Sequence, residues 1–444
     1  MTERRWLGEE ARTFRERHAP RLAALSTGEL DRELHRLVAA QVGHADDDCL
    51  VLYAGTNAPN PRLAALAGSS IGSRPNLGHP GAKHNRGMDA GSQLELLAQE
   101  AICRLYGCRY AELRVGSGSL ANLYVYMATT RPGDRILAFS DAAAGHPTHH
   151  AEGAAGLYGL DVHELPHDPE RMDVDLPRLA VVAAELRPKL IIVGGSMCLH
   201  PYDVRGVRAV ADEVGAHVLY DAAHMGGLIA GGRFQQPLQE GAHAITGSTY
   251  KSFGGPPSGM ILTDDPVLAE RLDAIAFPGL TANFDLARQA ALALAALDLL
   301  EHGAAYADRQ IANAQALAAA LAERCVAVLE VAGKGATSSQ HIALPTADPR
   351  TAARRLEAAN VLVSEIGVPS GGALRLGTQE LTRRGLEPGG TTAIAEVMAR
   401  VLVRGEAPET VRPDVVALRR QLESTLRFVR AEDRGLEREH DVGG

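Results

Sequence analysis

The residue with the clearest chemical potential in this sequence is Lys251, in the stretch TGSTYKSFGGPPSG at residues 246–259. The chain uses arginine freely but holds four lysines, of which the others are Lys83, Lys189 and Lys334. A lysine can lose its proton and attack a carbonyl carbon, whereas an arginine stays protonated in proteins. Lys251 is therefore a candidate for a covalent bond to an aldehyde.

Two further motifs supply groups that a phosphorylated aldehyde cofactor needs. In VGSGSLAN (115–122), small residues precede an apolar helix, so that backbone N–H groups and a helix N-terminus can face an anion. Asp221 follows an apolar strand and is trailed by His224; its carboxylate could pair with a protonated ring nitrogen. A phosphate site, a carboxylate and a Schiff-base lysine in this order fit pyridoxal 5'-phosphate.

The elements that must position these residues form a repeating α/β pattern. Short apolar runs at 134–140, 188–196 and 216–224 indicate strands buried on both faces, and they alternate with helical stretches such as 202–215. This alternation predicts an open, mostly parallel sheet between helices, with ligands beyond the carboxyl ends of the strands. The polar residues that fall at such ends are Ser196, Asp221, His224 and Lys251.

We expect four regions along the chain. An N-terminal helical arm (1–50) contains a capped helix at 27–43, and a large domain (51–284) begins with a Gly- and Pro-rich functional loop region at 53–91. An interdomain helix, about 285–302, leads into a small α+β domain that ends near 404, and the final region (405–444) holds one helix and a frayed tail. The elements expected beyond 302 are strands at 326–331, 340–346 and 373–378 and helices near 350–360, 390–403 and 414–429.

Composition excludes several classes of protein. The formal net charge is -9 without a basic stripe, which argues against a nucleic-acid partner. The charged N-terminus does not resemble a signal peptide, and no run of about twenty apolar residues predicts a membrane span. Five cysteines without a CxxC pair favour reduced thiols and a cytoplasmic location. A metal site in GHPTHH, from His146, His149 and His150, is disfavoured by the intervening Pro147.

From about residue 50 to 404 the sequence resembles the serine hydroxymethyltransferase family of fold-type I pyridoxal phosphate enzymes. The resemblance lies in GSGSLANLYVYMATTRPGDRIL, GHPTHH, PKLIIVGGS, ADEVGAHVLYDAAHMGGLIAGG, STYKS, GPPSGMIL, FPG and LRLGTQELTRRG. It implies a large domain with a mostly parallel seven-stranded sheet, a smaller C-terminal α+β domain, and pyridoxal 5'-phosphate as cofactor. It also implies a homodimer whose active sites are shared between subunits.

The resemblance assigns roles to individual residues. Lys251 matches the lysine of the internal aldimine, Asp221 the pyridinium partner, and Arg375 the arginine that clamps the substrate α-carboxylate. His146 matches the histidine that stacks on the pyridine ring, and His224 a histidine beside the phenolic oxygen. The other expected cofactor contacts are Ser117, Gly118 and Ser119 at the phosphate, Ser196 at the phenolic oxygen, and Ser248 and Tyr250 next to the lysine.

The segment PNLGHPGAKHNRGMD (75–89) departs from the family pattern. The family glutamate that moves a proton on the hydroxyl and folate side falls on Leu77, and the paired tyrosines fall on His84 and Asn85. A leucine cannot transfer a proton, so folate-dependent serine–glycine conversion is disfavoured. His79 and His84 are candidates for catalysis in this altered segment.

Three other positions differ from the family. Gly55, Thr56 and Asn57 replace its SEN, and we expect Thr56 and Asn57 to bind substrate. The glycine pair after FPG, which reaches the neighbouring subunit's phosphate, becomes Ala282 and Asn283, and the arginine three residues after the lysine becomes Gly254.

These observations leave several reactions open. We favour folate-independent aldol chemistry, as an aldolase or transaldolase, on a β-hydroxy-α-amino acid of specialised, antibiotic-type metabolism, with His146 or His84 as proton acceptor. The alternative is capture of the quinonoid by oxygen, giving oxidative decarboxylation and deamination of an amino acid such as a glycyl-nucleoside, as in a monooxygenase. Hydroxymethyl transfer, epimerisation and transamination are weaker alternatives. A pseudoenzyme is disfavoured, because a scaffold would not need Lys251, Asp221, His146 and Arg375.

Overall fold

The structure, a computed structural model, describes residue 4, residues 6–422 and residues 426–430. Residues up to Cys49 form one unit, which contains α1 (Glu9–Ala23), α2 (Thr27–Gly43) and a π-helical turn, His44–Asp48. The predicted helix at 27–43 is confirmed, and Ser26 caps it, donating from its backbone N–H and its hydroxyl to Glu29. Four apolar residues of this helix are exposed: Leu30, Leu34, Leu37 and Val38.

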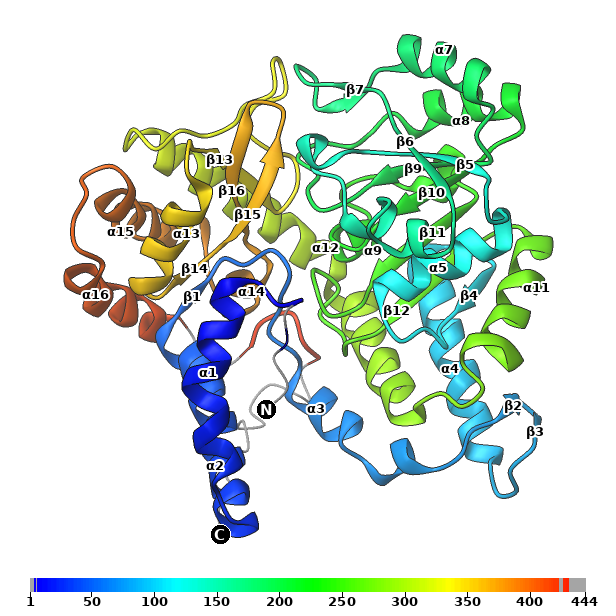
Figure 1. Ribbon diagram of the computed structural model, residues 1–444, viewed down its shortest axis with the longest axis horizontal. Helices are drawn as coiled ribbons and strands as arrows, with labels where there is room; N and C mark the ends of the chain where they lie inside the picture. Colours follow the sequence, from blue (N-terminus) through cyan, green and yellow to red (C-terminus); the bar gives the residue numbers. More distant parts are fainter. Residues whose placement is uncertain (1–3, 5, 423–425, 431–444) are drawn as a thin grey trace. The chain divides into compact units, whose positions relative to one another are not determined.

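The second unit begins at Leu50 and is built around a seven-stranded sheet. All its strands run parallel except β12, which pairs antiparallel with both neighbours, and this confirms the mostly parallel sheet predicted from the sequence (Figure 1). In spatial order the strands are β4 (Tyr110–Glu112), β12 (Gly259–Thr263), β11 (Ala244–Ser248), β10 (His217–Asp221), β9 (Leu190–Gly194), β5 (Arg135–Ala138) and β6 (Asp161–Glu164).

Helices cover both faces of this sheet, which explains why its strands are apolar at successive positions. Along β9, Leu190 and Ile192 join one core while Ile191 and Val193 join the other. The first core includes α5 (Gly118–Thr129), α6 (Ala154–Leu157) and α11 (Pro266–Ala274). The second includes α4 (Asp89–Tyr106), α7 (Leu176–Leu186), α8 (Val204–Val214), α9 (Gly226–Ala230) and the first half of α12, with α10 (Pro237–Glu240) at its edge.

Helix α12 runs from Leu286 to Ala322, so the predicted end near residue 302 was wrong. Gly303, which directly follows the predicted end, lies within the helix at a close approach to the C-terminal end of α9. A Cβ on Gly231 would fall 2.4 Å from the carbonyl oxygen of Gly303. The helix contributes apolar side chains to the large core and to the core of the following region. The expected domain boundary at 284/285 therefore remains a prediction.

The following region holds a three-stranded antiparallel sheet in the order β13 (His341–Pro345), β16 (Gly371–Gly377), β15 (Ser364–Val368). Two of the three predicted strands are thus confirmed. The third was wrong: residues 326–331 are irregular, with a single bridge from Val331 to Gly335. Their apolar pattern reflects burial of Val326 and Val331 without a ladder of backbone hydrogen bonds. The remaining elements are α13 (Pro349–Ala358), α14 (Gln379–Arg383), α15 (Thr391–Leu402), and β14 (Val361–Leu362) paired with β1 (Leu50–Val51).

The last described helix, α16, spans Pro408–Gln421, so the predicted helix at 414–429 was placed too late. Pro413, which directly precedes the predicted range, is accommodated inside the helix while Val411 and Val415 are buried. The expected frayed tail lies outside the described residues.

The loop region expected at 53–91 contains more regular structure than predicted. It holds α3 (Pro61–Ala67), a 3₁₀ turn (Ser70–Ser73) and a short hairpin of β2 (Gly78–His79) and β3 (Ala82–Lys83) before α4 begins. Within the described ranges, no helix combines the length and apolar character needed to cross a membrane.

Candidate active site

The small residues after β4 form a tight concave surface at the start of α5. Ser117 caps the helix by accepting the backbone N–H of Leu120 at 3.2 Å. A Cβ on Gly118 would fall 2.2 Å from Ser248 Oγ at the end of β11, so a larger residue there would displace the Ser248 hydroxyl. Three serines, Ser117, Ser119 and Ser248, and a helix N-terminus thus meet, which suits a phosphate group.

Asp221, at the end of β10, is buried and fixed by three donors. His149 Nε2 lies 2.9 Å and Asn122 Nδ2 3.0 Å from Oδ2, while the N–H of Ala223 donates to Oδ1 at 2.8 Å. His149 Nδ1 is in turn held by the hydroxyl of Tyr126 at 2.5 Å. Burial acts to raise the pKa of Asp221, but the hydrogen bond and charge of His149 hold it below its ordinary value. The group is therefore an ionised carboxylate.

His146 is linked to the phosphate-type surface through Thr148. The backbone N–H and the hydroxyl of Thr148 lie 3.1 Å and 2.6 Å from His146 Nδ1, and Ser119 Oγ lies 3.2 Å from Thr148 Oγ1. Burial lowers the pKa of His146 to about 4, so the ring is neutral. With Nδ1 accepting these bonds, the proton of the neutral ring sits on Nε2. To accept a proton at Nδ1, His146 would first have to lose its hydrogen bonds from Thr148.

Lys251 lies beside His224 in the centre of the site. Its Nζ is 3.1 Å from His224 Nε2, and the side chain is 7 % exposed. Burial lowers the pKa of Lys251 to about 8, with Asp221 and Arg375 acting in opposite directions. About a tenth of the amine is therefore in the neutral, nucleophilic form at pH 7, and this fraction rises steeply above that pH.

His224 is a neutral hydrogen-bond acceptor toward this lysine. Its Nδ1 lies 3.2 Å from the carbonyl oxygen of Ala54, and because a carbonyl can only accept a hydrogen bond, Nδ1 carries the ring proton. Its Nε2 is then free to accept from Lys251 and from Arg375 Nη1, which is 3.3 Å away. Burial and these two positive charges lower the pKa of His224 well below its ordinary value.

Arg375, on β16, is the charged group that faces Lys251 from the three-stranded sheet. Its Nε donates to Ser364 Oγ at 3.0 Å, and Nη1 donates to the carbonyl oxygen of Ser196. It is 6 % exposed, and burial lowers its pKa to about 10, so it remains a cation at neutral pH. A buried guanidinium next to an amine is suited to a carboxylate carried by an amino acid.

The remaining predicted residues of this region support the lysine in different ways. Asn57 Nδ2 donates to the carbonyl oxygen of Lys251 at 3.0 Å, and Thr56 donates to Glu380 at 2.8 Å, so both brace the site in this structure. Ser196 Oγ donates to the carbonyl oxygen of Gly145, and Tyr250 is half-exposed next to the lysine. Substrate binding by Thr56 and Asn57 stays a prediction.

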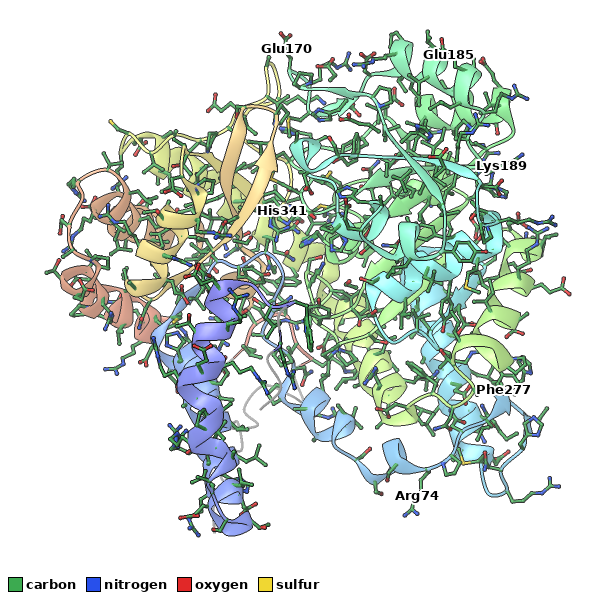
Figure 2. The ribbon with its side chains drawn as sticks, in the orientation of Figure 1. Arg74, Glu170, Glu185, Lys189, Phe277 and His341 are labelled. Atoms are coloured by element: carbon green, nitrogen blue, oxygen red, sulfur yellow. The ribbon has the colours of Figure 1, made fainter. Side chains whose placement is uncertain are left out.

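His79 and His84 do not join this cluster within one chain. Their rings lie 5.6 Å and 6.0 Å from that of Phe277, and His79 Nε2 is 2.9 Å from the carboxylate of Asp273. Figure 2 shows Phe277 well apart from His341, whose ring is 5.3 Å from that of His224. Their catalytic role therefore stays a prediction and would require a site from outside this chain.

Sequence reasoning missed three residues of the cluster. His149 was considered as a metal ligand, but it supports Asp221. His341 and the fully buried Arg383 carried no recognisable spacing signal. Arg383 donates to the carbonyl oxygens of Ala58 and Gly254, and a Cβ on Gly254 would fall 2.4 Å from its Nη1. Among the described residues, no group of three or more His, Cys, Asp or Glu side chains could hold a metal ion.

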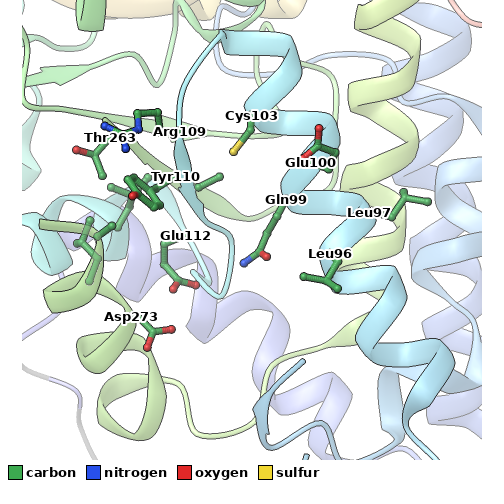
Figure 3. Close-up of a pocket in the computed structure, with 14 residues that line it drawn as sticks. Leu96, Leu97, Gln99, Glu100, Cys103, Arg109, Tyr110, Glu112, Thr263 and Asp273 are labelled. Carbon is green, nitrogen blue, oxygen red and sulfur yellow. The ribbon is translucent and has the colours of Figure 1, made fainter. Parts of the chain in front are cut away.

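A groove of about 730 Å³ lies elsewhere, between α4, β4, β12 and α11 (Figure 3). Leu96 and Leu97 of α4 line it together with Glu112 and Asp273, and neither Lys251 nor any residue bonded to it takes part. The chemistry of the lysine site therefore does not depend on this groove.

Fold and site together define an α/β protein suited to hold a phosphorylated, ring-containing aldehyde on a lysine. The fit rests on the Gly118 surface for the phosphate, ionised Asp221 for a protonated ring nitrogen, and Lys251 for the aldehyde carbon. These are the groups that pyridoxal 5'-phosphate requires.

Comparison with known proteins identifies the family. The sequence profile of serine hydroxymethyltransferase matches residues 28–398, and the chain belongs to this family. An alpha-methylserine aldolase from Ralstonia sp is 41% identical over 439 residues, covering 97% of this chain and 100% of that protein. A second, from Variovorax paradoxus, is 47% identical over 87% of this chain and 89% of that protein. The L-threonine transaldolase of Pseudomonas fluorescens, solved in its internal aldimine state, has the same fold, with a TM-score of 0.83, 23% identity, and coverage of 90% and 95% of the two chains.

Proposed function

We propose that this chain binds pyridoxal 5'-phosphate and cleaves the Cα–Cβ bond of a β-hydroxy-α-amino acid without folate. The substrate we propose is α-methylserine, split into formaldehyde and alanine. The observation that carries the proposal is the convergence of Lys251, Asp221, His224 and Arg375 in one buried site. The high identity to two alpha-methylserine aldolases supports the choice of substrate.

The residues that would hold the cofactor are those of the cluster. Ser117, Gly118, Ser119 and Ser248 would hold the phosphate, Asp221 the ring nitrogen, and Lys251 the aldehyde carbon. When bound, the cofactor supplies an electron sink for negative charge at Cα. The ionised state of Asp221 matters here, because a carboxylate keeps a ring nitrogen protonated.

The chain's own residues would orient the substrate and move its protons. Arg375 would clamp the α-carboxylate, and Lys251, once its amine has taken up a proton, lies where its ammonium form could give that proton to Cα after formaldehyde leaves. The proton of the substrate hydroxyl needs an acceptor. His146 is poorly prepared for this, because its Nδ1 already accepts from Thr148. His84 and His79 are therefore the better candidates, and Leu77 excludes the acid–base group of the folate-dependent relatives.

A homodimer would bring these histidines to a second lysine site. Their exposure beside Phe277 supports this part of the proposal, since His79 is 49% exposed. Leu96 and Leu97 of the adjoining groove are also half-exposed, and a second copy covering them would remove an apolar surface from water. We expect size measurement in solution to give a dimer; a monomer with full cofactor content and activity would contradict it.

The test is a product assay on purified holoenzyme without folate and without oxygen. With α-methylserine we expect formaldehyde and alanine in equal amounts, and Lys251→Ala should release neither. Two outcomes contradict the proposal. A requirement for tetrahydrofolate would indicate hydroxymethyl transfer, and product formation that needs oxygen with release of carbon dioxide would indicate the oxidative reaction.

A further inference from the structure

His341 is a buried histidine that shares a sheet face with Arg375. In the antiparallel pair of β13 and β16, His341 is opposite Gly377 and Ala343 is opposite Arg375. Because side chains alternate along a strand, all four positions lie on one face, and His341 is the diagonal neighbour of Arg375. The ring of His341 also lies 5.3 Å from that of His224, at 64°. The residue therefore belongs to the lysine site.

The hydrogen bonds of His341 fix which ring nitrogen carries its proton. The backbone N–H of Cys198 donates to Nδ1 at 3.3 Å, and a backbone amide can only donate. Burial, with the positive charges of Arg375 and Lys251, lowers the pKa of His341 well below its ordinary value. The ring is thus neutral with its proton on Nε2. His224 carries its proton on the other ring nitrogen, Nδ1, and its Nε2 accepts hydrogen bonds.

This Nε2–H group has no hydrogen-bond partner among the residues that the structure describes, although His341 is 0% exposed. Buried donors in native proteins are nearly always paired, because an unpaired one loses its bond to water. The positive charges that act on this ring are those of Arg375 and Lys251. A ligand that accepted a hydrogen bond from this group would also lie near two positive charges. A negatively charged ligand would therefore bind better than a neutral one.

We propose that His341 Nε2–H is a second donor to the substrate α-carboxylate, beside the guanidinium of Arg375. The inference rests on the proposed function, in which Arg375 clamps that carboxylate. A carboxylate has about four lone-pair positions, so two residues can bind it together. His341 then acts as a substrate-binding residue that adds directional specificity to the charge of Arg375.

The test compares two amines that differ in the carboxylate. Glycine and methylamine are titrated into holoenzyme, and binding is followed by the visible absorption of the bound cofactor. In His341→Phe we expect the glycine dissociation constant to rise about 10- to 100-fold, the usual effect of losing one bond to a charged group, with methylamine unchanged. His341→Gln keeps an N–H near the same place and should recover part of the affinity. Equal weakening of both amines, or no weakening of glycine, would overturn the proposal.

Two controls separate this inference from its premises. His200→Phe removes another buried histidine, bonded to Ser338 and Gly335, and should leave both amines unaffected. Arg375→Gln should also weaken glycine selectively. If it does not, the carboxylate assignment in the proposed function is wrong. If both variants discriminate but no aldol product forms, the carboxylate site stands and the reaction is wrong.

A measurement on the unsubstituted enzyme covers the case in which His341→Phe does not fold. In holoenzyme labelled with ¹⁵N-histidine, the Nε2–H resonance of His341 is assigned by its absence in His341→Gln. Propionate, which has a carboxylate but no amine, should shift this resonance. Saturating propionate without a shift would overturn the proposal.

Discussion

The lysine site and the altered segment around His79 and His84 are built in opposite ways. Lys251 and Arg375 are nearly inaccessible, and His224 links them by bonds of 3.1 Å and 3.3 Å. His79 and Asp273 are 49% and 42% exposed and sit next to Phe277. One region is complete within the chain, while the other presents its side chains outward. This difference is what the proposed homodimer requires, in which a second copy would complete the substrate end of the site.

Two of the four sets of residues that depart from the family pattern also lie together. The backbone N–H of Asn76 donates to Asn283 Oδ1 at 2.5 Å, which joins the altered segment 75–89 to the altered residues after FPG. Tyr124 bonds Thr281 in the same place. A single surface therefore carries both sets of changes, as expected if they serve one reaction.

The largest effect should come from Lys251→Arg, which keeps the charge and removes the ability to lose the proton. We expect activity to fall by more than about 1,000-fold, as is usual when a covalent nucleophile is removed. The cofactor absorption band should move to that of the free aldehyde. Lys189→Arg, on the exposed surface, should have no effect. An active Lys251→Arg enzyme would break the comparison, because the lysine site would then not be the reactive one.

Mixed dimers test whether the altered segment works in the partner's site. Lys251→Ala and the double variant His79→Ala/His84→Ala should each be impaired alone. If the histidines act across the interface, the mixed dimer has one intact site, and random mixing should restore about a quarter of the wild-type activity. Activity no higher than that of the unmixed variants would place both regions in the same subunit's reaction or remove the histidines from it.

The pH dependence of cofactor capture tests how the charges of the lysine site set the pKa of Lys251. The pKa of Lys251 is lowered to about 8, so its amine is protonated and unreactive below that pH and neutral above it. The capture rate by apoenzyme should rise about tenfold between pH 7 and pH 9 and then level off. Arg375 lowers this pKa and Asp221 raises it. Arg375→Gln should therefore move the profile to higher pH and Asp221→Asn to lower pH, and a shift in the same direction would contradict the assignment.

Alanine substitutions at two glycines, one in each region, test how tightly the two regions are packed. Gly254 and Gly81 have φ of 75° and 77°, but a Cβ meets Arg383 only at Gly254 and nothing within 4 Å at Gly81. Alanine at either position costs about 1 kcal/mol in backbone strain. The clash should add about 1–3 kcal/mol at Gly254. Thermal unfolding should thus show a larger loss for Gly254→Ala, and equal losses would show that Arg383 yields easily.

Some features of the fold followed from local patterns, and others did not. The strands at 190–194 and 217–221 were predictable because each contains a short apolar run, LIIV and VLY. The length of α12 was missed, because Gly303 looks like a helix end until its contact with Gly231 is known. The run at 326–331 was wrongly predicted as a strand. A segment that buries apolar side chains without pairing shows the same apolar pattern as a strand in a sheet. The predicted helix also began too late, after Pro413. Only the packing of Val411 and Val415 shows that the helix tolerates this proline.

The sequence by itself determined the chemistry at Lys251 and the family, because one amine, one carboxylate and a small-residue turn occur in a recognisable order. It could not determine which groups support them. His149 reaches Asp221 from 72 positions away, and Cys198 and His341 are 143 positions apart. Nor could it show that His79 and His84 lie beside Phe277. Such pairings depend on how strands and loops from distant parts of the chain are brought together, and burial then fixes the proton on each nitrogen.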